Sequence, residues 1–476
     1  MLQVRLNKAQ YEYDIHSLVK AFYPTEEVRV DQGDKPEGID ANRGIMYISF
    51  EKETTTICLW EAEGVEVAFK EVTADKNDFK RFLYRVLSEH TGKKLPWGNL
   101  TGIRPTKLAM AKLEEGFDDE EIAQWLKTEH YVSDEKAVLS IDIAKREKDI
   151  LSELHYEDGY SLYIGIPFCP TTCLYCSFTS YPYCVWKSRI EDYLNALFYE
   201  IECTADMMKG KILDTVYIGG GTPTTLEAEH LDKLLTKIKY NFDLSNVKEF
   251  TVEAGRADSI TKEKLEVLKK HNVGRISVNP QTMHNKTLRL IGRQHTVEQA
   301  EEAFRLAREI GFDNINMDII LGLPGEDTDD VAYTIERIKE LAPDNLTVHS
   351  LAIKRASKLS QWIRENGYES MNNTEATMTI AAKGAKDMGM EPYYLYRQKN
   401  MSGNFENVGY AKEGKNGIYN ILIMEEKQTI MALGAGSITK VVYPDGRIER
   451  CDNVKDVALY IERIQEMIDR KKELLG

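Results

Sequence analysis

The sequence predicts an α/β protein whose central part is a parallel β-sheet with helical crossovers. From about residue 158 to residue 355, short apolar segments typical of strands alternate with longer amphipathic segments typical of helices. Repeated βα units of this kind imply parallel strands, because each helix crosses over the sheet to the next strand. The flanking segments lack the alternation. We therefore expect three parts: an N-terminal α+β domain of unknown role (1–157), the core (158–355) and a C-terminal α+β extension (356–476) that covers the substrate.

In the N-terminal domain, the predicted strands are 44–50, 55–62 and 65–72, and the predicted helices are 78–89, 105–113, 119–129 and 134–151. Asp78, Asp119 and Asp134 are the expected N-caps. Residues 95–105 are rich in turn formers around one tryptophan and one arginine. This segment is either an ordered connector or a binding loop.

In the core, the predicted strands are 162–167, 215–218, 249–254, 275–279, 314–320 and 345–349, and the helices between them are 187–207, 228–241, 262–271, 297–310 and 329–341. A partial barrel and an open doubly wound sheet both fit this pattern. After residue 356 we expect a helical stretch, a strand at 417–424 and a final helix at 454–475.

The charge of the chain limits the classes of partner. Its 77 acidic and 62 basic residues give a formal net charge of −15, which argues against a nucleic-acid or anionic-membrane partner. Basic clusters at 354–355 and 397–399 are either solvated faces or contacts for an acidic small molecule. We expect no membrane span, because no apolar stretch reaches eighteen residues, and the first residues lack the apolar core of a signal peptide.

Three cysteines follow the first predicted core strand in the pattern CxxxCxxC: Cys169, Cys173 and Cys176. Clustered thiolates are soft ligands suited to iron–sulfur chemistry. A cluster of four irons held by three cysteines leaves one iron open to a small molecule. An oxygen-sensitive cluster and free thiols together predict a reducing, cytoplasmic location.

Zinc and disulfides are the alternative explanations of these cysteines. Structural zinc usually takes four Cys or His ligands, and the nearest candidates for a fourth, Cys184 and His155, lie at no familiar finger spacing. Disulfide frameworks belong mainly to small secreted domains. We expect Cys58, Cys203 and Cys451 to be ordinary buried thiols, whereas Cys184 is close enough to the motif to leave its role open.

Polar and glycine residues follow the later core strands. The run Gly219-Gly220-Gly221-Thr222 ends the second strand, and glycines let a backbone approach a ligand closely. Further polar residues near the ends of the next strands are Glu253, Gln281, Arg293 and Asp318. In a barrel these side chains would converge at the carboxyl ends of the strands. Each could instead cap a helix or form an ordinary ion pair.

Together these motifs resemble the oxygen-independent coproporphyrinogen III dehydrogenase family of radical S-adenosylmethionine (SAM) enzymes. The resemblance covers the core through segments 163–169, 173–178, 219–224, 292–295 and 318–325, and continues to 434–436. Segments 101–105 and 404–410 resemble the HemZ-like branch in particular. Such cores are mostly incomplete (β/α)6 barrels, so the resemblance favours a partial barrel over a doubly wound sheet.

The resemblance also implies cofactors and their ligands. It implies a [4Fe–4S] cluster held by the three cysteines and two molecules of SAM. Tyr163, Gly220 and Glu253 would contact the cluster-bound SAM. The residues that match the surroundings of a second SAM are Tyr175, Gly221, Thr222, Gln281, Arg293 and Asp318.

The activity implied is conversion of coproporphyrinogen III to protoporphyrinogen IX in anaerobic haem synthesis. A 5′-deoxyadenosyl radical takes hydrogen from a propionate β-carbon, and loss of CO2 and one electron leaves a vinyl group. We predict Tyr163, Arg355 and Arg397 as catalytic residues, the two arginines binding the carboxylates of this tetrapyrrole (porphyrinogen) substrate. The electron donor would be a low-potential protein such as flavodoxin or ferredoxin.

Two departures from the family pattern bear on the substrate. Gly165 stands where the family usually has histidine, and Phe178 where the best-studied dehydrogenases have a further cysteine. Phe178 resembles the haem-chaperone branch instead. However, residues 403–407 lack that branch's His-Asn-x-x-Tyr-Trp pattern. A haem chaperone and a radical SAM methyltransferase acting on a tetrapyrrole are the alternatives.

Overall fold

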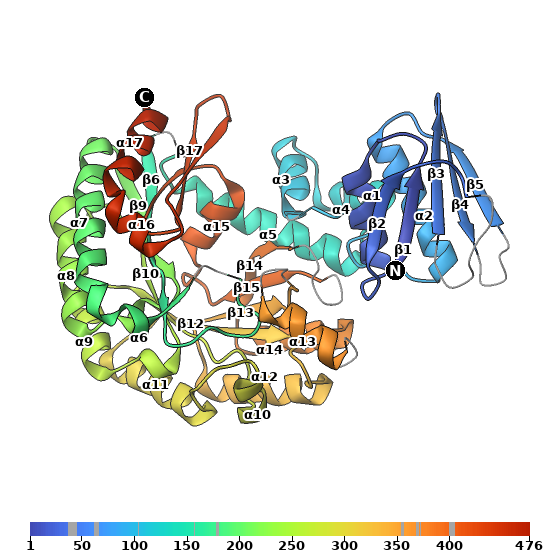
Figure 1. Ribbon diagram of the computed structural model, residues 1–476. Coiled ribbons are helices and arrows are strands. Elements are labelled where there is room, and N and C mark those ends of the chain that lie inside the picture. The colour runs from blue at the N-terminus through green and yellow to red at the C-terminus, as the bar shows by residue number, and fades with distance from the viewer. Residues whose placement is uncertain are drawn as a thin grey trace. The chain divides into compact units, whose positions relative to one another are not determined.

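The computed structural model describes residues 1–36, 45–60, 66–102, 104–156, 158–177, 180–353, 357–367, 371, 373–398 and 405–476. The chain divides into two compact units, each with its own sheet (Figure 1). The first consists of residues 1–145 and 396–406, and the second of residues 146–395 and 407–476. This division differs from the predicted domains, because 407–476 fold together with the core and 396–406 with the N-terminal unit.

The N-terminal unit contains a five-stranded sheet in the order β2-β1-β3-β4-β5. Its strands are β1 (Leu2–Leu6), β2 (Val28–Gln32), β3 (Ile45–Glu51), β4 (Thr54–Trp60) and β5 (Glu66–Val72). Apolar residues of β1, β3 and β4 form one core with those of helices α1 (Glu12–Phe22) and α2 (Lys76–Thr91). Three further helices follow: α3 (Thr106–Glu114), α4 (Asp119–His130) and α5 (Asp134–Ser152).

All three predicted N-caps of this unit were wrong. Helix α5 begins at Asp134 itself, and the Ser133 hydroxyl before it accepts a hydrogen bond from the Lys136 N–H (3.3 Å). Asp75, and not Asp78, caps α2 by accepting hydrogen bonds from the backbone of residues 77 and 78. Asp118 precedes α4 and forms a capping box with Glu121, so Asp119 is the first helical residue. At α2 and α4 several acidic residues lie together, and only the backbone conformation determines which of them accepts the bonds.

Six parallel strands form the centre of the second unit: β6 (Gly159–Ile166), β9 (Ile212–Gly220), β10 (Glu249–Gly255), β11 (Arg275–Val278), β12 (Ile315–Leu321) and β13 (Asn345–Ser350). They neighbour one another in sequence order. In a doubly wound sheet the order of the strands reverses at one point. The strands here follow sequence order without a reversal, which is the order of a partial (β/α)6 barrel. All six predicted core strands are confirmed within a few residues.

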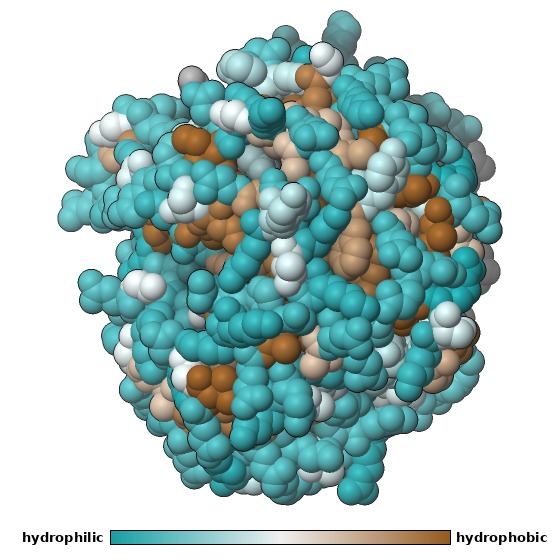
Figure 2. All heavy atoms as spheres, turned by 90° about the vertical axis from the view of Figure 1, so that its left-hand side faces the viewer, coloured by the Kyte–Doolittle hydropathy of each residue, from teal (hydrophilic) through white to brown (hydrophobic). Residues whose placement is uncertain are grey.

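The helices of the βα units lie outside these strands (Figure 1). They are α7 (Ile190–Met207), α8 (Ala228–Asn241), α9 (Lys262–Lys270), α11 (Val297–Ile310) and α12 (Thr328–Leu341). In α8, leucines 231, 234 and 235 and Ile238 are buried at i, i+3, i+4 and i+7. Hydrophilic side chains cover most of the outer face on the side of α7 to α9, and apolar residues form small separate patches there (Figure 2).

Shorter elements occupy the loops of this unit. They are strands β7 (Phe168–Cys169) and β8 (Tyr181–Pro182), helices α6 (Tyr183–Trp186) and α10 (Asn285–Leu290), and 3-10 turns at Lys187–Arg189, Pro223–Thr225 and Ala257–Ser259.

The chain after residue 356 extends the same sheet at both edges, which corrects the expectation of a separate C-terminal domain. Beside β13 lie β15 (Asn407–Ala411) and β14 (Glu391–Tyr396), while beside β6 lie β16 (Thr429–Leu433), β17 (Ile438–Val442) and β18 (Ile448–Asp452). β16 runs parallel to β6 and β15 antiparallel to β13. Main-chain hydrogen bonds therefore join this segment to the core.

The helices of this segment are α13 (Lys358–Asn366), α14 (Glu375–Asp387), α15 (Ile418–Glu425), α16 (Val457–Glu462) and α17 (Ile464–Leu475). The strand predicted at 417–424 was wrong, because this region forms α15. A short apolar run bounded by turn residues does not distinguish a strand from a buried helix. The final predicted helix is divided at Arg463 into α16 and α17. No helix of the described ranges is long and apolar enough to cross a membrane.

Candidate functional site

The cysteine motif lies in the loop that follows β6. Cys169 belongs to β7, and Cys173 and Cys176 lie in the turn after it. The turn is closed by a hydrogen bond from the Cys176 N–H to the Cys173 carbonyl (3.2 Å), and Leu174 N–H donates to the Ile291 carbonyl (2.9 Å). All seven cysteines lie in the described part of the chain and none forms a disulfide. The loop therefore holds three thiols at the carboxyl end of the first barrel strand.

The glycine run passes directly beside this loop. The N–H groups of Gly221 and Thr222 donate to the carbonyls of Ile166 (2.8 Å) and Phe168 (2.7 Å). A Cβ on Gly221 would lie 2.6 Å from the Phe168 oxygen and 3.0 Å from Cys169 Sγ. The absence of a side chain thus allows the β9 loop to contact the cysteine loop closely. Thr222 Oγ1 donates to Cys169 Sγ at 3.6 Å.

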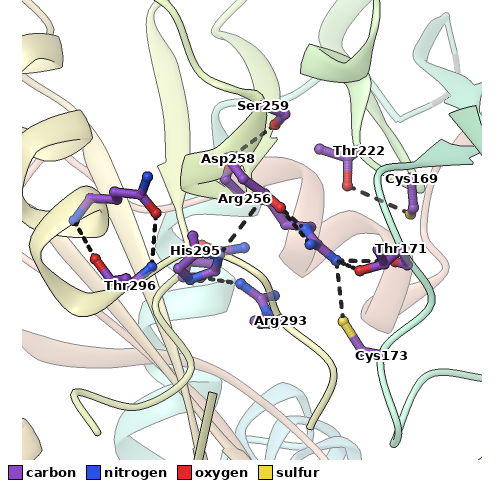
Figure 3. A network of polar contacts seen from close by, with 12 residues as sticks. Cys169, Thr171, Cys173, Thr222, Arg256, Asp258, Ser259, Arg293, His295 and Thr296 are labelled. Atoms are coloured by element: carbon purple, nitrogen blue, oxygen red, sulfur yellow. Dashed lines mark hydrogen bonds and ion pairs between the residues drawn. The ribbon is translucent and has the colours of Figure 1, made fainter. Parts of the chain in front are cut away.

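Arg256, which follows β10, contacts Thr171 and Cys173 of the cysteine loop (Figure 3). Its guanidinium group donates to Thr171 O (3.0 Å), Thr171 Oγ1 (2.9 Å) and Cys173 Sγ (3.7 Å). It also forms a bidentate ion pair with Asp258, in which Nε donates to Oδ1 (3.0 Å) and Nη2 donates to Oδ2 (2.6 Å). Arg256 is only 3% exposed.

Gln281 and Arg293 both lie between β11 and α11, on either side of the short helix α10. Gln281 has a left-handed backbone (φ 70°) and pairs with Ile319 of β12. Its side-chain Oε1 is buried and has no hydrogen-bond partner among the described residues. Arg293 is buried, donates to the Asn279 carbonyl (2.6 Å) and lies beside Tyr175. Although burial lowers the pKa of Arg293, the charges of neighbouring groups, Tyr175 first, hold it above its usual value.

Glu253 and Asp318 are carboxylates of β10 and β12 with opposite pKa shifts. Burial raises the pKa of Glu253 to about 7, against the lowering effect of the hydrogen bond from Tyr217. Burial also raises the pKa of Asp318, but contacts with His349 (3.6 Å) and Asn316 (2.6 Å) outweigh it and hold the pKa below its usual value. The barrel therefore contains one carboxylate that is ionised at neutral pH and one that titrates near neutrality.

Three tyrosine rings stack inside the partial barrel. Tyr163 of β6 lies 6.2 Å from Tyr217 of β9, and Tyr419 of α15 lies 4.4 Å from Tyr217 and 6.0 Å from Tyr163, measured between ring centroids. Burial raises the pKa of each hydroxyl. Helix α15 thus adds the ring of Tyr419 to this aromatic stack, and the Glu253 carboxylate accepts a hydrogen bond from the Tyr217 hydroxyl.

The residues present fit an iron–sulfur cluster and a polar cofactor. Three cysteine thiols in one loop are a soft donor set of the kind that holds such clusters. No three His, Cys, Asp or Glu side chains among the described residues converge on a point where a single metal ion would bind. A four-iron cluster requires no such point, because each thiolate binds a different iron. The unpaired Gln281 Oε1 indicates a position where a ligand would supply the missing donor.

The structure brings most of the predicted site residues to one end of the second unit. Those that lie in its β6, β9, β10, β11 and β12 regions are Tyr163, Cys169, Cys173, Tyr175, Cys176, Gly220, Gly221, Thr222, Glu253, Gln281, Arg293 and Asp318. Arg355 and Phe178 lie outside the described residues. Arg397 belongs to the N-terminal unit, where it donates to the Leu100 carbonyl (2.6 Å) and lies 5.8 Å from the Trp97 ring centroid. Cys184 is exposed on α6.

The sequence prediction missed four groups at the site: Arg256, Asp258, Tyr217 and Tyr419. Arg256 could have been selected by its position, since it follows the third core strand just as Gln281 follows the fourth. Tyr419 carried no such signal, because its segment was predicted to be a strand outside the barrel.

Comparison with known proteins agrees with this geometry. Residues 163–338 match the family model described as Radical SAM superfamily. The oxygen-independent coproporphyrinogen-III oxidase-like protein HemZ of Bacillus subtilis (strain 168) is 43% identical over 413 residues, 86% of this chain and 82% of that protein. The heme chaperone HemW of the same strain is 39% identical over 198 residues, 41% of this chain and 51% of that protein.

A solved structure shares the fold. Coproporphyrinogen III oxidase (HemN) from Escherichia coli, described as a radical SAM enzyme, superposes with a TM-score of 0.54 at 22% identity, over 67% of this chain and 72% of that one. Its fold, the family model and the extent of identity to the Bacillus protein agree with the three-cysteine loop and the singly wound strands. The chain belongs to the radical SAM superfamily, in the family of HemZ-type coproporphyrinogen-III oxidase-like proteins.

Proposed function

We propose that this protein catalyses oxidative decarboxylation of coproporphyrinogen III, converting two propionate side chains to vinyl groups and giving protoporphyrinogen IX. The observation that carries the proposal is the 43% identity, over 86% of the chain, to a protein named as coproporphyrinogen-III oxidase-like. Radical SAM membership implies a [4Fe–4S] cluster and SAM. When bound, these groups supply the one-electron chemistry that removes hydrogen from the propionate.

In this proposal the protein holds the cluster through Cys169, Cys173 and Cys176. Tyr163, Gly220 and Glu253 contact the SAM bound there. The pKa of Glu253, raised to about 7 by burial, lets the carboxylate ionise when the ammonium group of SAM arrives as its partner. The Tyr217 hydroxyl orients that carboxylate by donating a hydrogen bond to it.

A second SAM is proposed beside the first, in contact with Tyr175, Gly221, Thr222, Gln281, Arg293 and Asp318. Two features support it. Arg293 is a buried cation suited to a carboxylate. Gln281 Oε1 is buried and unpaired within the described chain, so it can accept a ligand N–H or O–H group.

The substrate carries four carboxylates, which require cationic partners. Arg355 and Arg397 remain our predicted contacts. Because Arg397 donates to Leu100 O, its replacement also affects the N-terminal unit. We expect Arg397→Ala to raise the KM for coproporphyrinogen III and to leave the cluster content unchanged. A loss of stability with an unchanged KM would contradict substrate binding by Arg397. A low-potential electron donor such as flavodoxin or ferredoxin and a cytoplasmic location complete the proposal.

The direct test is an anaerobic assay of the reconstituted protein with SAM, a reductant and coproporphyrinogen III. We expect harderoporphyrinogen, the product with one vinyl group, followed by protoporphyrinogen IX. If SAM is cleaved and neither product forms, the decarboxylase proposal fails.

A haem chaperone is the second candidate function, favoured by the 39% identity over 198 residues to heme chaperone HemW. The same preparation distinguishes the two. Haem retained in stoichiometric amounts after gel filtration, without any vinyl product, would support the chaperone. A methylated tetrapyrrole would instead indicate a methyltransferase.

The two proposed SAM positions can be separated by substitution. Glu253→Ala should abolish SAM cleavage, because its carboxylate contacts the cluster-bound SAM. Arg293→Ala and Asp318→Ala should lower vinyl formation more than they lower 5′-deoxyadenosine formation. Both products are measured in the same reaction, and equal losses in all three variants would contradict a second SAM.

A further inference from the structure

Arg256 contacts the cysteine loop at three atoms, although it is none of the residues proposed to bind SAM. One guanidinium nitrogen, Nη1, reaches both the carbonyl and the hydroxyl of Thr171 and lies 3.7 Å from Cys173 Sγ (Figure 3). The loop is therefore joined to the end of β10 through a charged group that is almost fully buried.

Asp258 fixes the orientation of this guanidinium group. Its two carboxylate oxygens accept from Arg256 Nε and Nη2, which leaves Nη1 directed toward the loop. Burial by itself would raise the pKa of Asp258. Hydrogen bonds and charges of His295 and Arg256 lower it by more, so the net pKa is below its usual value and the carboxylate is ionised. His295 also lies next to Asp258, with its Nδ1 atom 3.9 Å from Asp258 Oδ1. A paired, planar arginine of this kind has little rotational freedom.

The position of Nη1 has a consequence for a cluster bound through Cys173. Reduction adds one negative charge to the cluster and its sulfur ligands, and hydrogen bonds to those sulfurs are among the factors that set the potential. A buried cation that donates to a ligand sulfur stabilises the more negative, reduced form, since electrostatic effects are stronger where water is excluded. Thr222 provides a neutral counterpart at Cys169.

We propose that Arg256 is a positioning residue that holds the cysteine loop in its ligand-binding conformation and raises the reduction potential of the cluster bound there. The proposal rests on the cluster ligands proposed above. Arg256 would make the cluster easier to reduce by the electron donor, and Asp258 would maintain this effect by orienting the guanidinium group.

The test compares Arg256→Gln, Arg256→Lys and wild type as full-length, anaerobically reconstituted proteins. Arg305→Gln is the matched control, because Arg305 is an exposed residue of α11 paired with Glu301. Iron and sulfide are measured first, and the midpoint potential is then determined by EPR-monitored redox titration. We expect Arg256→Gln to lower the equilibrium constant for reduction about tenfold, a shift of about 59 mV to more negative potential. Arg256→Lys, which keeps the charge, should shift the potential less.

A second measurement does not require the cluster. In cluster-free protein, hydrogen exchange of the peptide containing Leu174 and Cys176 should be faster in Arg256→Gln than in wild type or Arg305→Gln, because the loop loses its contacts with Arg256. Unchanged hydrogen exchange in Arg256→Gln would overturn the positioning role. An unchanged midpoint potential at normal cluster content would overturn the effect on the reduction potential. If wild-type protein assembles no [4Fe–4S] cluster, the proposed function fails, while the exchange comparison still tests the positioning role.

Discussion

Cys169 and Cys173 differ from the other cysteines in the groups around their sulfur atoms. Thr222 and Arg256 donate to them. Burial raises the pKa of Cys169, against the lowering effect of the hydrogen bond from Thr222, and burial raises the pKa of Cys58 to about 11. Burial likewise raises the pKa of Cys451 in β18. A raised pKa therefore does not separate the two groups of cysteines; the donors at Cys169 and Cys173 do, because they stabilise the thiolate that binds metal.

At the residue scale, single replacement of Cys169, Cys173 or Cys176 by alanine should abolish a stable cluster, because three thiolates must act together. Cys58→Ala and Cys451→Ala are the controls and should retain full iron and sulfide content. EPR of the reduced proteins with and without SAM provides the measurement. A normal SAM-perturbed signal from Cys173→Ala would show that the cluster is held elsewhere.

Glu253 should make stability depend on pH. Its folded-state pKa of about 7 exceeds the unfolded value of about 4.3, so the folded protein binds more protons between these values. Stability should therefore fall as pH rises from about 4 to 7, by roughly 4 kcal/mol in all. Glu253→Gln removes this effect and should stabilise cluster-free protein at pH 8 but hardly at pH 4.5.

Urea unfolding of both proteins at the two pH values measures this difference. Glu302→Gln, which replaces an exposed glutamate of α11, is the control and should change stability equally at both. An equal effect of Glu253→Gln at pH 4.5 and pH 8 would mean that Glu253 has an ordinary pKa in the folded protein.

At the element scale, the end of β9 and the cysteine loop fit together only because residue 221 is glycine. Gly221→Ala would place a Cβ 2.6 Å from a backbone oxygen, so one of the two loops must move. Such overpacking typically costs about 1–3 kcal/mol. We therefore expect lower stability and reduced iron content in this variant.

Gly102→Ala is the matched control, because a Cβ there meets no atom within 4 Å. Iron per chain after reconstitution and the urea midpoint of cluster-free protein are measured for both variants. Wild-type iron content in Gly221→Ala would contradict the close approach of the two loops.

At the scale of the whole molecule, a buried ion pair joins the last helix to the barrel. Lys471 of α17 and Glu200 of α7 are both fully buried. Glu200 also accepts from the Gly434 N–H (2.8 Å) and from the Tyr460 hydroxyl (2.5 Å). Breaking such a pair leaves an uncompensated charge, which costs about 3–5 kcal/mol. Lys471→Met should therefore destabilise the protein by that amount.

The neighbouring Lys472 is exposed, so Lys472→Met should leave the urea midpoint unchanged. The double variant Glu200→Gln/Lys471→Met should recover part of the stability, because it removes the remaining charge. If Lys471→Met unfolds at the wild-type urea concentration, the pair does not join α17 to the barrel in solution.

The sequence by itself determined the βα alternation, the cysteine and glycine motifs and the edge of the sheet where they gather. These features are local: strand and helix periods are read within ten to twenty residues, and strand ends place the residues after them at one edge. Gln281 could be selected on that basis, whereas Arg293 and Asp318 also lie in the motifs 292–295 and 318–325 that resemble the family.

Only the tertiary structure decided how distant segments pair. The parallel pairing of β16 with β6, the insertion of Tyr419 beside Tyr163, and the contact of Arg256 with Cys173 join residues far apart in the chain. An apolar run such as 418–424 is compatible with a strand or a buried helix until its surroundings are known. Likewise, Arg256 contacts Cys173 because the loops after β10 and β6 turn toward each other. The sequence of either loop alone does not determine this.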